Sequence, residues 1–116
     1  MINNLKYYNP VRMLFILFLG CYYTNAWPAT PIIHIDIKNH LFSPSEITIP
    51  ENTKVKLIIH NKDATDEEFE SYELNREKVI LGNRKGVIFI GPLPAGEYPF
   101  FGEFFPKTAQ GKVIVK

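Results

Sequence analysis

The stretch FSPSEITIPENTKVKLIIHNKD, residues 42–63, carries the pattern on which the fold assignment rests. A proline-bounded bend leads into the short β-branched run EITI, and a polar turn follows it. Residues 54–61 then alternate, and one face of the predicted strand is apolar: Val55, Leu57 and Ile59. The stretch therefore predicts two strands separated by a polar turn.

The same β pattern continues through the chain from residue 27 onward. Residues 32–38 (IIHIDIK) alternate, and the segments EFESYEL, EKVIL, GVIFIGPL, PAGEYPFF and GKVIV follow, with the turn signal GNRK at 82–85. Turn signals recur about every 8–12 residues, and no helical periodicity competes with them. Residues 27–116 are therefore expected to form one all-β domain, a sandwich of seven or eight strands.

Residues 1–26 have the features of a secretory signal peptide. Lys6 and Arg12 precede a short apolar run at 13–20, and the small-residue exit TNA follows it. The run is short for a bilayer span, so a permanent transmembrane helix is the weaker alternative. Cys21 follows a glycine at the end of the run, which leaves lipoprotein anchoring open as a minority alternative. The domain is thus expected to be periplasmic or otherwise exported.

Charge and cysteine content exclude several classes of function. Cys21 is the only cysteine, so residues 27–116 offer no disulfide, thiolate ligand or thiol nucleophile. Loss of Lys6 and Arg12 with the leader reduces the 13 basic residues to 11, against 12 acidic ones, and so nucleic-acid binding is not expected. No Ser-His-Asp set, phosphate loop or H-E-x-x-H motif is present, and neither enzymatic activity nor a small-molecule substrate is expected.

Residues 42–63, together with the closing segments LPAGEYPFF and GKVIV, resemble a cupredoxin in their order and spacing. The resemblance covers most of residues 32–116 and implies a Greek-key β-sandwich.

On the cupredoxin frame, the copper-ligand positions fall on residues that cannot form a type 1 copper site. The cysteine position falls on Gly102, the following histidine on Phe105, the axial methionine near Gln110 and the upstream histidine near Glu67. A blue-copper centre needs two imidazoles, a thiolate and a weak axial ligand. The resemblance therefore implies the fold without the blue-copper electron carrier.

An acidic stretch, DATDEEFESYE, replaces the upstream copper ligand and holds six carboxylates in the eleven residues 63–73. Oxygen ligands suit hard cations such as ferric iron, manganese, calcium or magnesium. Glu68 and Glu103 are the preferred ligands, with Glu67 or Glu70 as the third. Alternation along the strand puts Glu67 on the face opposite Glu68 and Glu70, so not all three share one site.

The motif EFES followed by YPFFGEF.P.TAQG is similar to a subgroup of bacterial exported cupredoxin-like proteins. Those proteins are associated with periplasmic iron uptake beside an iron permease and another periplasmic metal-binding protein. The resemblance implies iron as the bound ion, with copper less favoured, and those two proteins as partners. The chain departs from the pattern at Phe105, where many relatives have a histidine.

Simpler interpretations of these residues remain open at this level. The acidic stretch also fits a solvated edge strand whose charges block pairing. Glu103 also fits a surface ion pair with Lys107 or Arg76.

The aromatic run Phe100, Phe101, Phe104 and Phe105 is expected to be mostly core. Exposed beside Glu103, its last two members would instead form a docking patch for a membrane or periplasmic partner of a metal-free module.

The three histidines show no ligand spacing. His34 and His60 fall in different alternating strands and are expected at opposite ends of the sandwich. His40 follows a turn, and its distance from the acidic end is left open. Single histidines on strands are more often surface or hydrogen-bonded residues than metal ligands.

Overall fold

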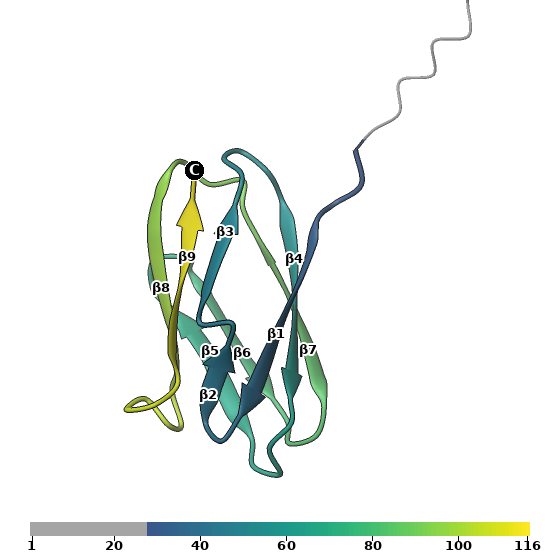
Figure 1. The fold of residues 1–116 in the computed structure, drawn as a ribbon, viewed down its shortest axis with the longest axis vertical. Helices are drawn as coiled ribbons and strands as arrows, with labels where there is room; N and C mark the ends of the chain where they lie inside the picture. The colour runs from purple at the N-terminus through teal and green to yellow at the C-terminus, as the bar shows by residue number, and fades with distance from the viewer. Residues whose placement is uncertain (1–27) are drawn as a thin grey trace, which may run out of the picture.

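Residues 28–116 are described by the computed structural model, and they form two β-sheets packed face to face (Figure 1). The signal peptide and lipid anchor predicted within residues 1–26 lie outside the described residues. The strands are β1 (Ile32–Lys38), β2 (Leu41–Ser43), β3 (Glu46–Ile49), β4 (Val55–Asn61), β5 (Glu67–Ser71), β6 (Arg76–Ile80), β7 (Lys85–Ile90), β8 (Gly96–Gly102) and β9 (Gln110–Val115). Within residues 28–116, no helix is long and apolar enough to cross a membrane.

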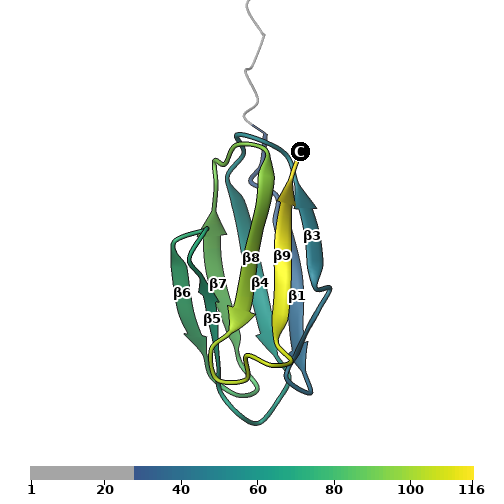
Figure 2. The same ribbon diagram turned by 90° about the vertical axis from the view of Figure 1, so that its left-hand side faces the viewer.

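The first sheet has the order β2-β1-β4-β7 and the second the order β3-β9-β8-β5-β6. Figure 2 shows β8, β9 and β3 of the second sheet side by side. Two pairs are parallel, β1 with β4 and β3 with β9, and the other pairs are antiparallel. The predicted all-β sandwich is confirmed. Residues 28–116 form nine strands, one more than the seven or eight expected, because the segment before Pro44, expected as a bend, forms the three-residue strand β2.

The core lies between the sheets and follows from the period-two alternation of apolar residues. In β4 every second residue is buried, beginning with Val55. Three aromatic rings fill the centre: Phe69 stacks on Phe100 with a centroid separation of 4.9 Å, and Phe42 meets Phe100 edge-on at 5.0 Å. Burial of these side chains is the main force that holds the two sheets together.

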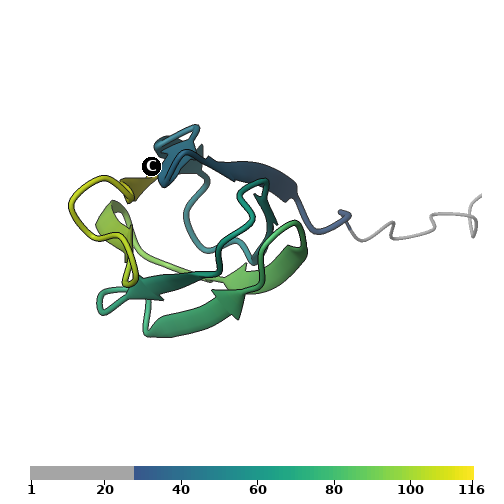
Figure 3. The same ribbon diagram turned by 90° about the horizontal axis from the view of Figure 1, so that it is seen from below.

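Four connections gather at one end of the sandwich, which Figure 3 views from below: β1–β2, β4–β5, β6–β7 and β8–β9. The β1–β2 turn has two residues, Asn39 and His40, with φ angles of 53° and 58°. Positive φ at both positions is the type I′ geometry that suits the twist of a two-residue hairpin. This end carries the residues that replace copper ligands in the cupredoxin frame.

Candidate metal centre

The acidic strand β5 lies inside its sheet, between β8 and β6, and is not an edge strand. The edge-strand interpretation of the acidic stretch is therefore wrong, because β6 covers that side of β5. Phe69 points into the core, so the residues on either side of it, Glu68 and Glu70, lie on the outer face of the sheet. In β6, Glu77 lies directly opposite Glu70 and adds a further carboxylate to this face.

Glu68, Glu70 and Glu103 form the carboxylate cluster that the sequence predicted in part. One carboxylate oxygen from each lies within 4.8 Å of the others. Glu103 is brought there by the backbone, since its N–H donates to the carbonyl of Glu68 at 2.9 Å. Glu103 is exposed and Glu68 half-buried, whereas Glu70 is only 8% exposed.

The carboxylate Oε2 of Glu70 is buried and has no hydrogen-bond partner. A buried carboxylate oxygen without a protein donor is costly, so this group favours a proton or a cation beside it. Among residues 28–116, no ion pair joins Glu103 to Lys107 or Arg76. The Arg76 guanidinium instead donates to the carbonyls of Phe89 and Asn75.

Burial and the neighbouring carboxylates raise the pKa values of Glu68 and Glu70. Burial raises the pKa of Glu68 above its ordinary value of 4.5, and the charge of Glu103 and a hydrogen bond with it raise this pKa further. Burial also raises the pKa of Glu70, with additional contributions from the charges of Glu77 and Glu103. Groups with raised pKa values favour a proton or a cation in their midst.

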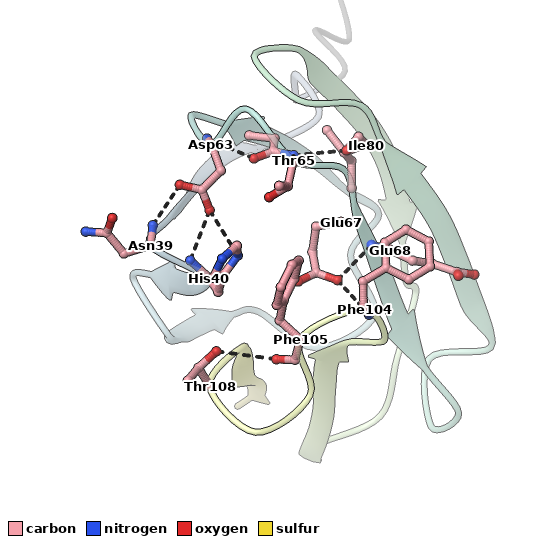
Figure 4. A network of polar contacts seen from close by, with 11 residues as sticks. Asn39, His40, Asp63, Thr65, Glu67, Glu68, Ile80, Phe104, Phe105 and Thr108 are labelled. Carbon is pink, nitrogen blue, oxygen red and sulfur yellow. Dashed lines mark hydrogen bonds and ion pairs between the residues drawn. The ribbon is translucent and has the colours of Figure 1, made fainter.

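Glu67 points into the sandwich, on the face opposite the cluster, and is only 1% exposed. Its Oε1 accepts hydrogen bonds from the backbone N–H of Glu68 at 2.9 Å and of Phe104 at 3.0 Å (Figure 4). Its Oε2 is buried without a partner. Glu67 thus ties β5 to the β8–β9 loop and does not join Glu68, Glu70 and Glu103.

The positions that would hold copper ligands are close together and filled by other side chains. A Cβ added at Gly102 would lie 2.5 Å from the Glu67 carboxyl carbon and 2.7 Å from the Cβ of Ala109. The Phe105 ring stacks on His40 with centroids 3.5 Å apart, and the His40 Nδ1 lies 3.5 Å from Asp63 Oδ2. Figure 4 shows Glu67, Phe105, His40 and Asp63 at this end of the sandwich.

The aromatic run is divided between core and surface. Phe100 is buried, and Phe101 is half-buried with its ring 5.7 Å from that of Tyr72. Phe105 is half-buried against His40, whereas Phe104 is 48% exposed. The expected core role holds for Phe100, and Phe104 is the member of the run that faces solvent beside Glu103.

His34 and His60 lie side by side, so their expected separation to opposite ends of the sandwich is wrong. The Nδ1 of His34 is 3.0 Å from the Nε2 of His60. Sequence alternation could not reveal this, because the contact depends on the parallel pairing of β1 with β4, in which Asp36 lies opposite His60. His34, two residues before Asp36, is then the diagonal neighbour of His60 on the outer face.

Comparison with known proteins agrees with this architecture. The sequence profile of the cupredoxin-like domain family matches residues 11–115. An uncharacterised protein of Rickettsia prowazekii (strain Madrid E) is 47% identical over 83 residues, which are 72% of this chain and 66% of that protein. The chain thus spans just under two thirds of the length of this relative.

Solved structures share the fold at low sequence identity. The metal-binding domain of the Cu(I)-exporting P-type ATPase CopA from Streptococcus pneumoniae D39 superposes with a TM-score of 0.66 at 19% identity, covering 78% of this chain and 92% of that one. The "blue" copper protein auracyanin A from Chloroflexus aurantiacus gives 0.64 at 15% identity, covering 76% and 100%. Amicyanin from Paracoccus versutus gives 0.58 at 20% identity, covering 78% and 85%. At these identities the likeness shows a common fold.

Proposed function

Because this chain belongs to the cupredoxin-like domain family and lacks the cysteine, histidine and methionine of a type 1 copper site, we propose that it is an exported accessory protein that binds a metal ion on carboxylates. The expected ion is iron or another hard cation, with copper less favoured. The protein relays the ion to an iron permease or exchanges it with a periplasmic metal-binding protein. The role is one of binding and delivery and not of catalysis.

The observation that carries the proposal is the cluster of Glu68, Glu70 and Glu103, with ligand oxygens within 4.8 Å of one another. Two features distinguish it from an ordinary acidic surface. Glu70 is 8% exposed and its buried Oε2 lacks a partner. The cluster also straddles two elements, β5 and the β8–β9 loop, which the Glu103–Glu68 backbone hydrogen bond holds together.

The dimensions of the cluster suit an oxygen-bound cation. Two ligand oxygens of one ion lie at most twice the bond length apart, about 4.6–5.2 Å for Ca²⁺ and about 4.0–4.2 Å for Mg²⁺. Oxygens within 4.8 Å of one another are near the Ca²⁺ range, and three of them bind one Ca²⁺ after a small closing movement. An ion with shorter bonds requires the carboxylates to close in, and the exposed Glu103 and half-buried Glu68 have room to rotate.

The location and the partners rest on separate support. Export is based on the signal peptide predicted for residues 1–26, and the link to iron uptake on the similarity of EFES and YPFFGEF.P.TAQG to the iron-uptake subgroup. Neither follows from the geometry of the cluster.

Exposed Phe104 favours a second candidate function, a metal-free module that docks on a membrane or periplasmic partner. The side chain is 48% exposed, while its N–H is fixed by buried Glu67. A rigidly presented aromatic ring is typical of a docking anchor. On this hypothesis Phe104→Ser abolishes partner capture, whereas Glu68→Gln/Glu103→Gln leaves it intact.

Calorimetric titration of the purified full-length protein tests the metal site. Iron(III) supplied as its citrate complex, Mn²⁺, Ca²⁺ and Cu²⁺ are titrated separately into wild type and into the Glu68→Gln/Glu103→Gln double variant. We expect saturable binding of at least one hard cation, weakened by about ten-fold or more in the double variant, because losing even outer-shell partners costs roughly 10–100-fold. Glu51→Gln, an exposed glutamate in the β3–β4 turn, is the matched control and should bind as wild type does.

The absence of heat with every ion, or equal heat in wild type and the double variant, would refute the metal site. If the hard cation that binds most tightly is not iron, the metal site stands but its part in iron uptake is refuted.

A further inference from the structure

The second sheet carries the carboxylate cluster, and the first sheet carries an unrelated group of metal-binding side chains on its outer face. His34 in β1 and His60 in β4 present the nitrogens Nδ1 and Nε2 to each other at 3.0 Å. The two rings are tilted by 49° with centroids 5.2 Å apart, so they converge edge to edge and do not stack. The strands β1 and β4 run side by side (Figure 1).

We propose that His34 and His60 form a second metal site, for a borderline divalent transition-metal ion such as Zn²⁺, Ni²⁺ or Cu²⁺, with the Asp36 carboxylate as third ligand. Imidazole is the ligand that these ions prefer in proteins. The site is separate from the hard-cation site in sheet, in ligand type and in the ions that it takes.

The nitrogen separation matches what one ion requires. With metal–nitrogen bonds of about 2.0–2.1 Å, two ligand nitrogens lie about 2.8–3.0 Å apart at a right angle and about 3.3–3.4 Å apart at the tetrahedral angle. The observed separation is 3.0 Å. Binding therefore needs little change in the nitrogen separation, while each ring rotates so that both lone pairs point at the ion and the paired strands hold the two backbones in place.

Asp36 becomes the third ligand by rotation of its side chain, because among residues 28–116 its carboxylate does not already form a three-ligand group with the two imidazoles. It lies on the same face as His34, two residues along β1, and opposite His60 in the strand register. Its pKa is lowered chiefly by a hydrogen bond from Lys62, with further contributions from the charge of Lys62 and then of His60 and His34.

The carboxylate of Asp36 forms an ion pair with the Lys62 Nζ at 2.8 Å, and the Asp36 side chain is 37% exposed. Ion pairs this exposed contribute little free energy, so the carboxylate can leave Lys62 for a metal.

The proton balance of binding is simple. In the neutral pair, one facing nitrogen carries a proton and the other accepts it. An ion needs lone pairs on both facing nitrogens, so that proton moves to the outward nitrogen of the same ring. No proton is released when both rings are neutral, and one is released for each ring that begins as imidazolium. His34 is exposed and His60 half-buried, so both rings are open to ions from solvent.

The test uses purified full-length protein without a polyhistidine tag, in the Glu68→Gln/Glu103→Gln background so that the carboxylate cluster does not contribute. Zn²⁺ is titrated by calorimetry, and Cu²⁺ binding is followed by electron paramagnetic resonance. We expect one saturable Zn²⁺ site and nitrogen hyperfine splitting from two imidazoles. His34→Ala and His60→Gln should each weaken Zn²⁺ binding by about ten-fold or more, and Asp36→Asn should weaken it less.

His40→Ala is the matched control, because His40 is the remaining histidine of residues 28–116 and stacks on Phe105. It should leave Zn²⁺ affinity unchanged, and the imidazole ¹⁵N shifts of His34 and His60, but not of His40, should move on titration. Absence of both Zn²⁺ and Cu²⁺ binding, or loss of binding on only one of the His34 and His60 substitutions, would overturn the proposal. Because the background lacks two cluster carboxylates, failure here leaves the hard-cation site untouched.

Discussion

The carboxyl group of Glu67 occupies the space directly above Gly102, where a Cβ would lie 2.5 Å from its carboxyl carbon. In the cupredoxin frame, Glu67 falls near the upstream histidine position and Gly102 on the cysteine position. The two positions still meet, but a carboxylate that binds two backbone N–H groups now fills the space between them. This end of the sandwich is thus closed by a buried carboxylate and its two backbone hydrogen bonds.

Gly102→Ala should destabilise the protein because the new methyl group collides with Glu67 and with the Cβ of Ala109. Overpacking a core costs roughly 1–3 kcal/mol. Urea denaturation of wild type and variant measures the difference. In a Glu67→Ala background the cost of Gly102→Ala should be smaller, since part of the collision is removed. Equal costs in both backgrounds would show that the two residues are not in contact.

Glu67→Gln and Glu67→Leu should differ sharply in stability. Glutamine keeps an acceptor oxygen for the N–H groups of Glu68 and Phe104, whereas leucine leaves both donors without this acceptor at a part-buried position. Each unsatisfied buried donor costs about 1–3 kcal/mol. We expect Glu67→Leu to lose about 2–4 kcal/mol of unfolding free energy in chemical denaturation, and Glu67→Gln to lose less than about 1 kcal/mol.

The same pair of variants separates the two roles considered for Glu67. As a loop-fixing residue on the inner face, it should not affect cation binding, and Glu67→Gln should titrate with hard cations as wild type does. Weakened binding in Glu67→Gln would instead restore Glu67 to the ligand set.

Period two was enough to place the acidic residues of β5 on their correct faces. Because Phe69 must point inward, its neighbours Glu68 and Glu70 must point outward, and Glu67 must share the inner face. The cupredoxin resemblance placed the β8–β9 loop at the same end, and so the proximity of Glu103 could also be predicted. Alternation does not determine the order of the strands, so the sequence alone left β5 compatible with an edge strand of the sheet.

The contact between His34 and His60 could not be predicted from the sequence. Nothing local to His34 or His60 indicates that β1 pairs with β4, because the two strands are joined through β2 and β3 and the pairing is parallel. Register between distant strands is set by the fit of the whole core, not by the residues that it happens to bring together. The same limit applies to His40, whose contact with Phe105 depends on the turn that precedes β2.

The carboxylate cluster should make the metal-free protein less stable at neutral pH than in mild acid. The pKa values of Glu68 and Glu70 are raised above 4.5 in the folded state. Between the ordinary pKa and the raised pKa values, the folded chain therefore holds more protons than the unfolded chain. The free energy of unfolding falls as pH rises through that range. The penalty is complete above the raised values and absent below the ordinary one.

Glu68→Gln/Glu70→Gln should therefore raise the thermal midpoint at about pH 7 and leave it nearly unchanged at about pH 4, as measured by circular dichroism in the presence of a chelator. A lower midpoint in the double variant at neutral pH would mean that the two carboxylates attract a group that stabilises them. Saturating hard cation should reverse the ranking, because wild type alone gains stability from binding.

Asp63 should contribute stability of the opposite pH dependence. Its Oδ1 and Oδ2 accept hydrogen bonds from the N–H groups of Asn39 at 2.8 Å and His40 at 3.0 Å, so it ties the β4–β5 loop to the β1–β2 turn. The bond from His40, the bond from Asn39 and the charges of His40 and Lys38 outweigh burial and lower its pKa below 3.8. With hydrogen bonds to a charged group worth about 1.5–3 kcal/mol, Asp63→Ala should lose roughly 2–3 kcal/mol at neutral pH.

Because the folded pKa of Asp63 lies below the unfolded one, this contribution is fully present above about 3.8 and is lost as pH falls through the lowered value. The stability difference between wild type and Asp63→Ala, measured by urea denaturation across that range, should shrink in acid. Asp63→Asn is the control, because it keeps one acceptor and has no charge to titrate. Its stability should lie between those of wild type and Asp63→Ala at neutral pH, and its advantage over Asp63→Ala should not change with pH. A wild-type advantage over Asp63→Ala that persists unchanged in acid would mean that Asp63 acts through packing and not through its charge.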